Sequence, residues 1–359
     1  YFFLFLNISF LRGFDIGDIP LQDEGRIKPL DTFARNHLLA FYGKRSLEKL
    51  ELTATDWLMN LILYPEAGRN QKIFNIRNPE VASSLFLDWN SYHRYSFNEI
   101  VPGLREQSTL LMTINEKDNQ DRTIFEKQLY ELSNNIARFE ELIYLKALKL
   151  IPPSLNSNAD EWLAPFDFIL MGFKSDEQQN KVLTALQGYL SGRMIKEEQK
   201  MVSSLFSYKS ALESFPNLNI DINILEQETW MNQVNLFYYS LAFYLIGFFL
   251  LMFALMIKPI LLNQLSYSFL VIGASLHGYG IYLRMYIMGR PPVTTLYESV
   301  IFVSFIIVFL AIILEYFRKD GLGTFIGAVS GSILHYIGFS YASDGDTLGM
   351  LVAVLDSNF

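Results

Sequence analysis

Long apolar stretches fill the last third of this chain, whereas the rest mixes apolar and charged positions over short distances. A helix needs about 20 predominantly apolar residues to cross a bilayer. Segments of this length and composition occur at 236–257, 265–286, 296–317 and 321–342. The pattern therefore predicts an all-α membrane protein with a helical bundle of four transmembrane helices.

The preceding part, residues 15–235, has the composition of a domain that is exposed to water. Between 124 and 150, apolar residues recur at gaps of three and four, as they do on one face of a helix. Pro152 and Pro153 are expected to end this helix, because proline lacks the backbone N–H that a helix interior requires. Clean alternation of apolar and polar positions is scarce, so the domain is predicted to be mainly helical, with little sheet.

Two further helical regions are expected in the same domain. Residues 176–214 are predicted to form two helices with a break near Gly192. A shorter helix is predicted over 29–42. Asp31 or Thr32 is a suitable N-cap for it, because its side-chain oxygen accepts a hydrogen bond from a backbone N–H.

Charges in the short loops predict how the bundle is oriented. Lys258 lies in one such loop, and Arg318 and Lys319 lie in another. The positive-inside rule places both loops in the cytoplasm. The loop 287–295 and the domain 15–235 are then expected on the opposite side, so the fold prediction includes an extracytoplasmic, mainly helical domain.

The two ends of the sequence are interpreted as parts of a longer protein. Residues 1–14 begin with an apolar run that is shorter than a spanning helix requires. We interpret them as the tail of a preceding transmembrane helix. Residues 343–359 are expected to form a segment on the outer side that leads into a further C-terminal part.

Composition excludes several classes of function. The formal net charge of -8 argues against a nucleic-acid partner, which favours a basic surface. The absence of cysteine excludes disulfides, thiolate metal sites and cysteine nucleophiles within this chain. No catalytic Ser/His/Asp set or glycine-rich phosphate loop is recognisable, and His37 and His93 are expected to be surface or cap residues.

Two of the four apolar segments carry a stripe of glycines with one histidine each. The members of each stripe recur at gaps of three and four, so they share one helix face. The stripes are Gly273, His277, Gly280 and Arg284, and Gly327, Gly331, His335 and Gly338. Small residues allow helices to approach closely, so both histidines are expected to point into the bundle. Hydrogen bonding to a neighbouring helix, ligation of haem iron and proton transfer remain open as their roles.

A second candidate site combines ionisable residues at the end of an apolar segment. Gly289, Arg290, Pro291 and Pro292 predict a rigid turn, since proline restricts both itself and the residue before it. Glu298 follows near the start of the next helix, where the macrodipole favours negative charge. Arg284, Arg290 and Glu298 are therefore expected to form one network. It either ties the loop by salt bridges or pairs its arginines with carboxylates of an anionic ligand.

Three sets of segments resemble a known family. They are Ile19–Gln22 followed by Gly25–Thr32 (IPLQ and GRIKPLDT), Arg284–Tyr286 with Gly289–Pro292 and Leu296–Ser299 (RMY, GRPP and LYES), and Leu351–Phe359 (LVAVLDSNF). Together they resemble the CcsA/ResC family of cytochrome c biogenesis proteins, known as system II. The resemblance is greatest to versions that are fused to a CcsB/ResB part. Thr295 stands where the family often has asparagine.

The resemblance implies a multi-pass protein of the bacterial inner membrane, with its large domain in the periplasm. Such a protein handles b-type haem as its substrate. As a holocytochrome c synthase, it promotes thioether attachment of haem to the Cys-x-x-Cys-His motif of apocytochrome c. Its partners are haem, apocytochrome c, the lipid bilayer and the remaining CcsB/CcsA portion. The family's tryptophan-rich haem segment and its flanking histidines are expected after Phe359.

The catalytic residues stay unassigned at this stage, whereas the candidate haem-contacting residues can be named. They are His277, His335, Arg284, Arg290, Tyr297 and Glu298, with the two histidines as candidate ligands of haem iron. A non-catalytic membrane receptor or assembly factor, and an anion transporter, remain as alternative functions.

Overall fold

The computed structural model describes residues 13–47, 51–154, 161–170, 176–215, 220–257, 260–342 and 347–349. The chain separates into two compact units, Gly13–Ile220 and a second unit that begins at Asp221. The expected features at Lys258 and within residues 1–12 and 351–359 lie outside the described residues. Each unit is described below by itself.

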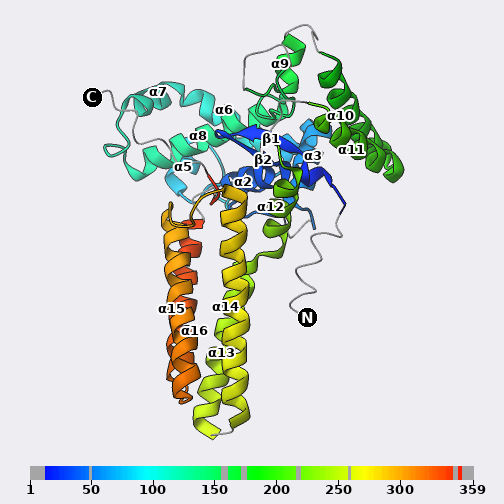
Figure 1. Cartoon of the computed structure of the whole chain (residues 1–359). Helices are drawn as coiled ribbons and strands as arrows, with labels where there is room; N and C mark the ends of the chain where they lie inside the picture. Colours follow the sequence, from blue (N-terminus) through cyan, green and yellow to red (C-terminus); the bar gives the residue numbers. More distant parts are fainter. Residues whose placement is uncertain are drawn as a thin grey trace, which may run out of the picture. The chain divides into compact units, whose positions relative to one another are not determined.

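The second unit is built from four long apolar helices, as the sequence predicts (Figure 1). They are α13 (Leu236–Ile257), α14 (Ile260–Met288), α15 (Leu296–Arg318) and α16 (Leu322–Tyr341). Each is long and apolar enough to cross a membrane. Helix α13 packs along α14 and also contacts α16, and α15 packs along α16. The bounds agree closely with the predicted spans, except that α14 extends beyond 265–286 at both ends.

A fifth helix, α12 (Ile222–Val234), also belongs to this unit. The division by contacts thus falls before α12, whereas the change in composition lies at residue 235. Trp230 of α12 packs edge-on against Tyr279 of α14, with ring centroids 6.1 Å apart. This contact explains why a polar helix groups with the apolar bundle. Asn235 separates α12 from α13 in the left-handed conformation, with φ of 50°.

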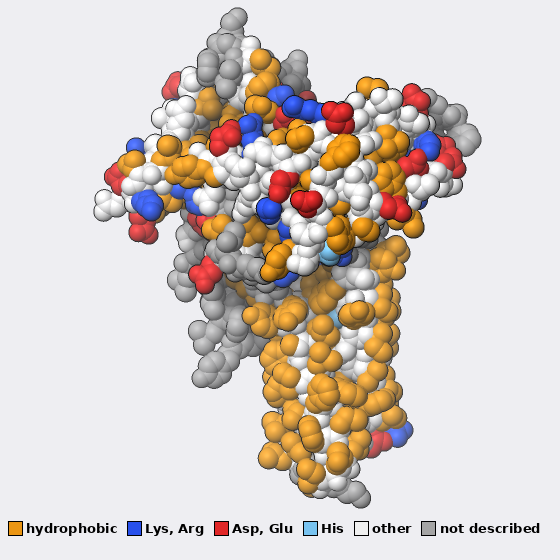
Figure 2. Space-filling view, turned by 180° about the vertical axis from the view of Figure 1, so that it is seen from behind, with side chains coloured by type: hydrophobic (Ala, Val, Ile, Leu, Met, Phe, Trp, Pro, Cys, Tyr) orange, Lys and Arg blue, Asp and Glu red, His pale blue; other side chains and the backbone are white. Residues whose placement is uncertain are grey.

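Hydrophobic side chains cover the outer surface of α13–α16 on the face drawn in Figure 2. Met256, Phe317 and Tyr336 are among the most exposed of them. An apolar surface this extensive is costly in water and suits contact with lipid. The surface and the helix lengths together identify the unit as membrane-spanning.

The glycine stripes of α14 and α16 face the interior, as expected, and all their members are buried. They make room for Tyr244 of α13. A Cβ atom at Gly273 would lie 2.7 Å from the Tyr244 ring, and one at Gly331 would lie 2.8 Å from it. These distances are too short for a side chain, so glycine at both positions permits the close packing.

The Gly13–Ile220 unit is mainly helical, also as predicted. After a short 3-10 helix at Ile16–Asp18, its helices are α2 (Leu30–Tyr42), α3 (Ala54–Leu63), α4 (Pro65–Asn70), α5 (Pro79–Ser84), α6 (Phe97–Glu106), α7 (Ser108–Glu116), α8 (Ile124–Ile143), α9 (Pro165–Leu170), α10 (Glu177–Ile195) and α11 (Glu198–Glu213). Aromatic rings of α2, α3 and α8 meet in its core, where Phe41 packs edge-on against both Trp57 and Phe139.

Strands play a small part in the described residues of this unit. β1 (Pro20–Asp23) pairs antiparallel with β2 (Arg26–Pro29), so Leu21 lies opposite Lys28. β3 (Phe74–Asn75) pairs antiparallel with β4 (Arg94–Tyr95). The expectation of little sheet is confirmed for the described part of the chain.

Local details differ from the sequence prediction at two helix ends. Helix α8 ends at Ile143, well before the prolines at 152 and 153, because Leu145 adopts a left-handed φ of 56°. The break between α10 and α11 falls at Lys196, whose φ is 57°, rather than at Gly192. Gly192 is buried within α10. A Cβ there would lie 3.1 Å from Met201, so this glycine serves the packing of the two helices.

The expected N-cap of α2 is also wrong. Pro29 occupies the N-cap position without a side-chain hydrogen bond. Asp31 instead accepts hydrogen bonds from Arg35 Nε at 2.7 Å and from Thr55 Oγ1 at 3.2 Å. The carboxylate therefore ties α2 to α3 rather than capping its own helix.

Candidate functional site

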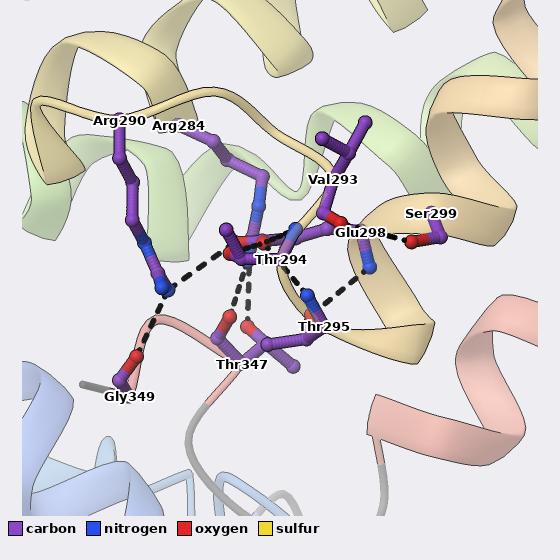
Figure 3. A network of polar contacts seen from close by, with 9 residues as sticks. All are labelled: Arg284, Arg290, Val293, Thr294, Thr295, Glu298, Ser299, Thr347 and Gly349. Carbon is purple, nitrogen blue, oxygen red and sulfur yellow. Dashed lines mark hydrogen bonds and ion pairs between the residues drawn. The ribbon is translucent and has the colours of Figure 1, made fainter. Parts of the chain in front are cut away.

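Arg284, Arg290 and Glu298 form one network in the membrane-spanning unit, as the sequence predicts (Figure 3). Arg284 Nη2 lies 3.1 Å from Glu298 Oε1, and Arg290 Nη2 lies 3.7 Å from the same oxygen. Arg284 comes from the last turns of α14, and Arg290 follows the left-handed Gly289 that ends this helix. The side chains of Arg284 and Glu298 are almost completely buried.

The second carboxylate oxygen of Glu298 fixes the start of α15. Glu298 Oε2 accepts hydrogen bonds from the backbone N–H groups of Thr294 at 3.1 Å and Thr295 at 3.2 Å. Thr295 is the N-cap, and its hydroxyl accepts the backbone N–H of Glu298. This is a capping box. One carboxylate therefore caps a helix and neutralises an arginine at the same time.

The two arginines also hold a short segment that the sequence did not single out. Arg284 donates to the hydroxyl of Thr347 at 3.1 Å and to the carbonyl of the same residue. Arg290 Nη2 donates to the carbonyl of Gly349 at 2.9 Å. Between them, Leu348 is only 2% exposed and packs with Trp230. Nothing in the local pattern of residues 347–349 indicates these contacts, because they depend on groups far away in the sequence.

In the described part of this network positive charge is in excess, because the two guanidinium groups share the carboxylate of Glu298. Among the described residues, the Nε–H groups of Arg284 and Arg290 are buried and have no hydrogen-bond partner. A surplus positive charge with unused donors suits an additional anion, since guanidinium binds carboxylate and phosphate well. Tyr297 adds a ring 4.9 Å from Arg284 Cζ.

His277 and His335 meet each other inside the bundle. Their ring centroids are 4.4 Å apart and their planes are inclined by 76°. Both side chains are fully buried. The expectation that both histidines point into the bundle is confirmed. Their pairing joins α14 to α16.

The hydrogen bonds of His277 define its tautomer. Its Nε2 lies 3.0 Å from the carbonyl oxygen of Ile301, which can only accept, so Nε2 carries the proton. Its Nδ1 lies 3.0 Å from the Tyr244 hydroxyl and accepts from it in the neutral ring. A neutral imidazole satisfies both contacts.

The hydrogen bonds of His335 are compatible with two protonation states. Its Nδ1 lies 2.8 Å from the carbonyl of Gly331 and must donate to it. Its Nε2 lies 2.9 Å from Ser240 Oγ, which is itself 2.9 Å from the carbonyl of Phe237. The single hydroxyl proton of Ser240 can satisfy only one of these two acceptors. The contacts suit either a neutral His335, which accepts from Ser240, or an imidazolium, which donates to it.

These contacts bear on metal binding. Both ring nitrogens of each histidine have protein partners, so iron ligation requires one of those partners to be exchanged. Within the described ranges, no group of three His, Cys, Asp or Glu side chains is placed to hold a metal ion. Of the roles considered for the two histidines, the structure directly shows hydrogen bonding to a neighbouring helix.

The other two histidines have local roles in the Gly13–Ile220 unit. His37 Nδ1 donates to the carbonyl of Phe33 at 3.0 Å, and its ring lies 4.1 Å from the Phe33 ring. Burial lowers the pKa of His37. His93 adopts a φ of 52°, and its ring packs against Trp89 in a tilted arrangement, with ring centroids 4.3 Å apart. His37 is thus a packing residue on α2, rather than a simple surface residue.

Comparison with protein-family models and with curated proteins finds nothing that matches this chain. The function must therefore be argued from the two polar groups of the membrane-spanning unit. The first is the Arg284–Arg290–Glu298 network, and the second is the pair His277 and His335.

Proposed function

We propose that this chain is the membrane part of a system II cytochrome c synthase of the CcsA/ResC type. In this proposal it spans the bacterial inner membrane, and the Gly13–Ile220 unit lies in the periplasm. Haem is its substrate and is presented on the periplasmic side to apocytochrome c. The cysteines that form the thioether bonds belong to apocytochrome c, so a chain without cysteine suits this role.

The main support for the proposal is that three residues from three separate motif segments lie close together. Arg284, Arg290 and Glu298 belong to the RMY, GRPP and LYES segments through which the sequence resembles the family. They lie in one network, in which the described residues supply two guanidinium groups and one carboxylate. A haem propionate is a carboxylate, and the Nε–H groups of the two arginines, which have no hydrogen-bond partner within the described ranges, are suitable donors for it.

The histidine pair has a defined place in the same proposal. Imidazole nitrogen is a common axial ligand of haem iron. For His335, the Nε2 contact with Ser240 is the one that can be released, because the Ser240 hydroxyl has Phe237 as a second acceptor. Nδ1 would keep its hydrogen bond to Gly331, which orients the ring. His335 is therefore the better candidate ligand of the two.

Haem content and cytochrome c maturation test the proposal. The full-length protein with R290A is compared with the wild type for haem that co-purifies from membranes and for thioether-linked cytochrome c in the cells. The expected result is a decrease of about tenfold in both, which corresponds to the loss of one charged hydrogen bond. R318A is the matched control, because Arg318 lies at the other end of α15 and its ion pair in the described structure is with the exposed Asp320.

Membrane levels of each variant separate loss of function from loss of folding. R290K keeps the charge but loses the planar fork, so it should retain part of the haem. The proposal is wrong if R290A reaches wild-type levels of haem and of mature cytochrome c.

The alternative functions predict different results. An anion transporter would carry an anion flux in liposomes that R290A abolishes without any dependence on haem. A receptor or assembly factor would leave cytochrome c maturation unaffected by either variant. Neither alternative accounts for the resemblance of all three motif segments to one family.

A further inference from the structure

The Gly13–Ile220 unit contains a pocket that plays no part in the proposed function. Its volume is about 440 Å³, and it is lined by residues near the end of α2 and near the paired strands β3 and β4. Tyr42, Lys72, Tyr92 and Arg94 contribute to its wall. Two of these residues are cations and two are aromatic, and no acidic side chain of the described residues lines the pocket.

Arg94 is held in this wall by one end of its guanidinium group. Its Nη1 donates to the carbonyl of Tyr42 at 2.6 Å and to the carbonyl of Ile73 at 3.2 Å. The Arg94 Cζ atom also lies 3.9 Å from the centre of the Tyr42 ring. The side chain is thus fixed by neutral groups, in a position that does not depend on any carboxylate.

The other edge of the same guanidinium has no partner. Among the described residues, Arg94 makes no ion pair, and its Nε and Nη2 atoms make no hydrogen bond. Nε–H and one Nη2–H point in the same direction, so together they form the side-on fork that binds two oxygens of a carboxylate or phosphate. Neither atom is among the buried groups without a partner, so both remain accessible.

The surroundings of Arg94 also favour the binding of an anion. Burial lowers the pKa of Arg94, and repulsion by Arg77 lowers it further, although Tyr42 acts in the opposite direction. Lys72 contributes a second positive charge to the wall, partly neutralised by its ion pair with Glu99 at 2.8 Å. Positive charge gathered in a pocket attracts anions over several ångströms.

We propose that this pocket is a binding site for an oxyanion, a phosphate or carboxylate group, which is held side-on by the Nε and Nη2 atoms of Arg94. The remainder of the ligand lies against the tyrosines of the wall. Tyr92 is 76% exposed, so its ring is available to contact the ligand at the mouth of the pocket. The oxyanion belongs either to a soluble small molecule or to a phospholipid headgroup.

Binding to the full-length protein tests this proposal with two sets of probes. Inorganic phosphate and citrate are titrated calorimetrically into the detergent-solubilised protein. Nanodiscs of phosphatidylcholine, with or without phosphatidylglycerol, are compared by the quenching of tryptophan fluorescence with brominated acyl chains. Each measurement is made on the wild type, on R94Q and on R105Q. Arg105 is an exposed arginine of α6 outside the pocket wall, and R105Q is the matched control.

The expected result is binding that R94Q weakens by about tenfold or more and that R105Q leaves unchanged. If phosphate or citrate behaves in this way, the ligand is a soluble anion. If only the phosphatidylglycerol nanodiscs do, the ligand is a lipid headgroup. The proposal fails if no probe shows binding that depends on Arg94.

A second variant keeps the test valid if R94Q disturbs folding, since Arg94 also bonds two backbone carbonyls. K72E places a negative charge in the wall and leaves those hydrogen bonds intact. It is expected to weaken anion binding in the same direction. Unchanged binding in K72E and R94Q together would overturn the proposal.

Discussion

His277 of α14 and His335 of α16 lie edge to face in the centre of the bundle, with ring centroids 4.4 Å apart. Each is hydrogen-bonded to a third helix, His277 to Tyr244 and His335 to Ser240. Both of these partners lie on α13. The pair therefore links three helices through polar contacts in the buried interior of the bundle, where an unsatisfied polar group would be costly.

Removing the hydroxyl of Tyr244 tests how much these polar contacts contribute to the stability of the bundle. Y244F keeps the ring between Gly273 and Gly331 but leaves His277 Nδ1 without its donor. We expect the free energy of unfolding to fall by about 1 kcal/mol, the usual value of one buried hydrogen bond. Denaturant or thermal unfolding in detergent measures it. Y239F is the control, because Tyr239 is exposed on the same helix, and an equal loss in both variants would contradict the prediction.

Close packing at Gly331 predicts a larger effect from a single methyl group. A Cβ atom there would lie 2.8 Å from the Tyr244 ring and 3.0 Å from Val308. G331A should destabilise the bundle by about 1–3 kcal/mol, because the added methyl group overpacks the core and Tyr244 cannot move without disturbing its hydrogen bond to His277. The change in unfolding midpoint is compared with that of I333A, whose side chain is exposed on the same helix. A neutral G331A would show that α13 and α16 can separate freely.

Glu298 should be more important for stability than a surface ion pair. E298Q removes the only carboxylate that Arg284 contacts in the described network. It leaves a buried guanidinium without its counter-charge, which costs about 3–5 kcal/mol when a buried pair is broken. The double variant E298Q/R284Q should recover part of this loss, because no charge is then left unpaired. A double-mutant cycle on unfolding free energies measures the coupling, and strictly additive losses would argue against it.

Asp56 of α3 predicts a pH dependence for the Gly13–Ile220 unit. Burial raises the pKa of Asp56, but hydrogen bonds from Thr53 and Arg193, and the charge of Arg193, outweigh this effect and lower it below its usual value. Between the folded and unfolded pKa values the unfolded chain binds more protons, so stability rises with pH in that window. The contribution is complete above about pH 4 and is lost as the pH falls through the lower folded value.

Two variants isolate this contribution. D56N and R193Q should each reduce the loss of stability on acidification below about pH 4, and the double variant should reduce it no further. Unfolding of the full-length protein, followed as a function of pH, provides the measurement. If neither variant changes the slope of the unfolding free energy against pH, the acid sensitivity comes from other carboxylates.

Features that depend on composition over many residues could be predicted from the sequence. The four spanning helices follow from unbroken apolar segments, because lipid requires both the length and the internal hydrogen bonding of a helix. The inward direction of His277 and His335 follows from their spacing to glycines on one face. The Arg284–Glu298 contact was expected because both residues flank one short loop.

Tertiary structure decided the features that depend on contacts between distant segments. Thr347 and Gly349 bind the arginines through backbone carbonyls, and such groups leave no mark in the residue pattern. The contact between His277 and His335 required the register of α14 against α16, which is set by how Tyr244 fits between Gly273 and Gly331. Helix ends at Leu145 and Lys196 depended on single left-handed residues that local propensity does not favour. The sequence alone determined which faces must be buried, because burial follows periodicity. Only the folded chain determined which side chains meet there, because that depends on the packing of all the helices together.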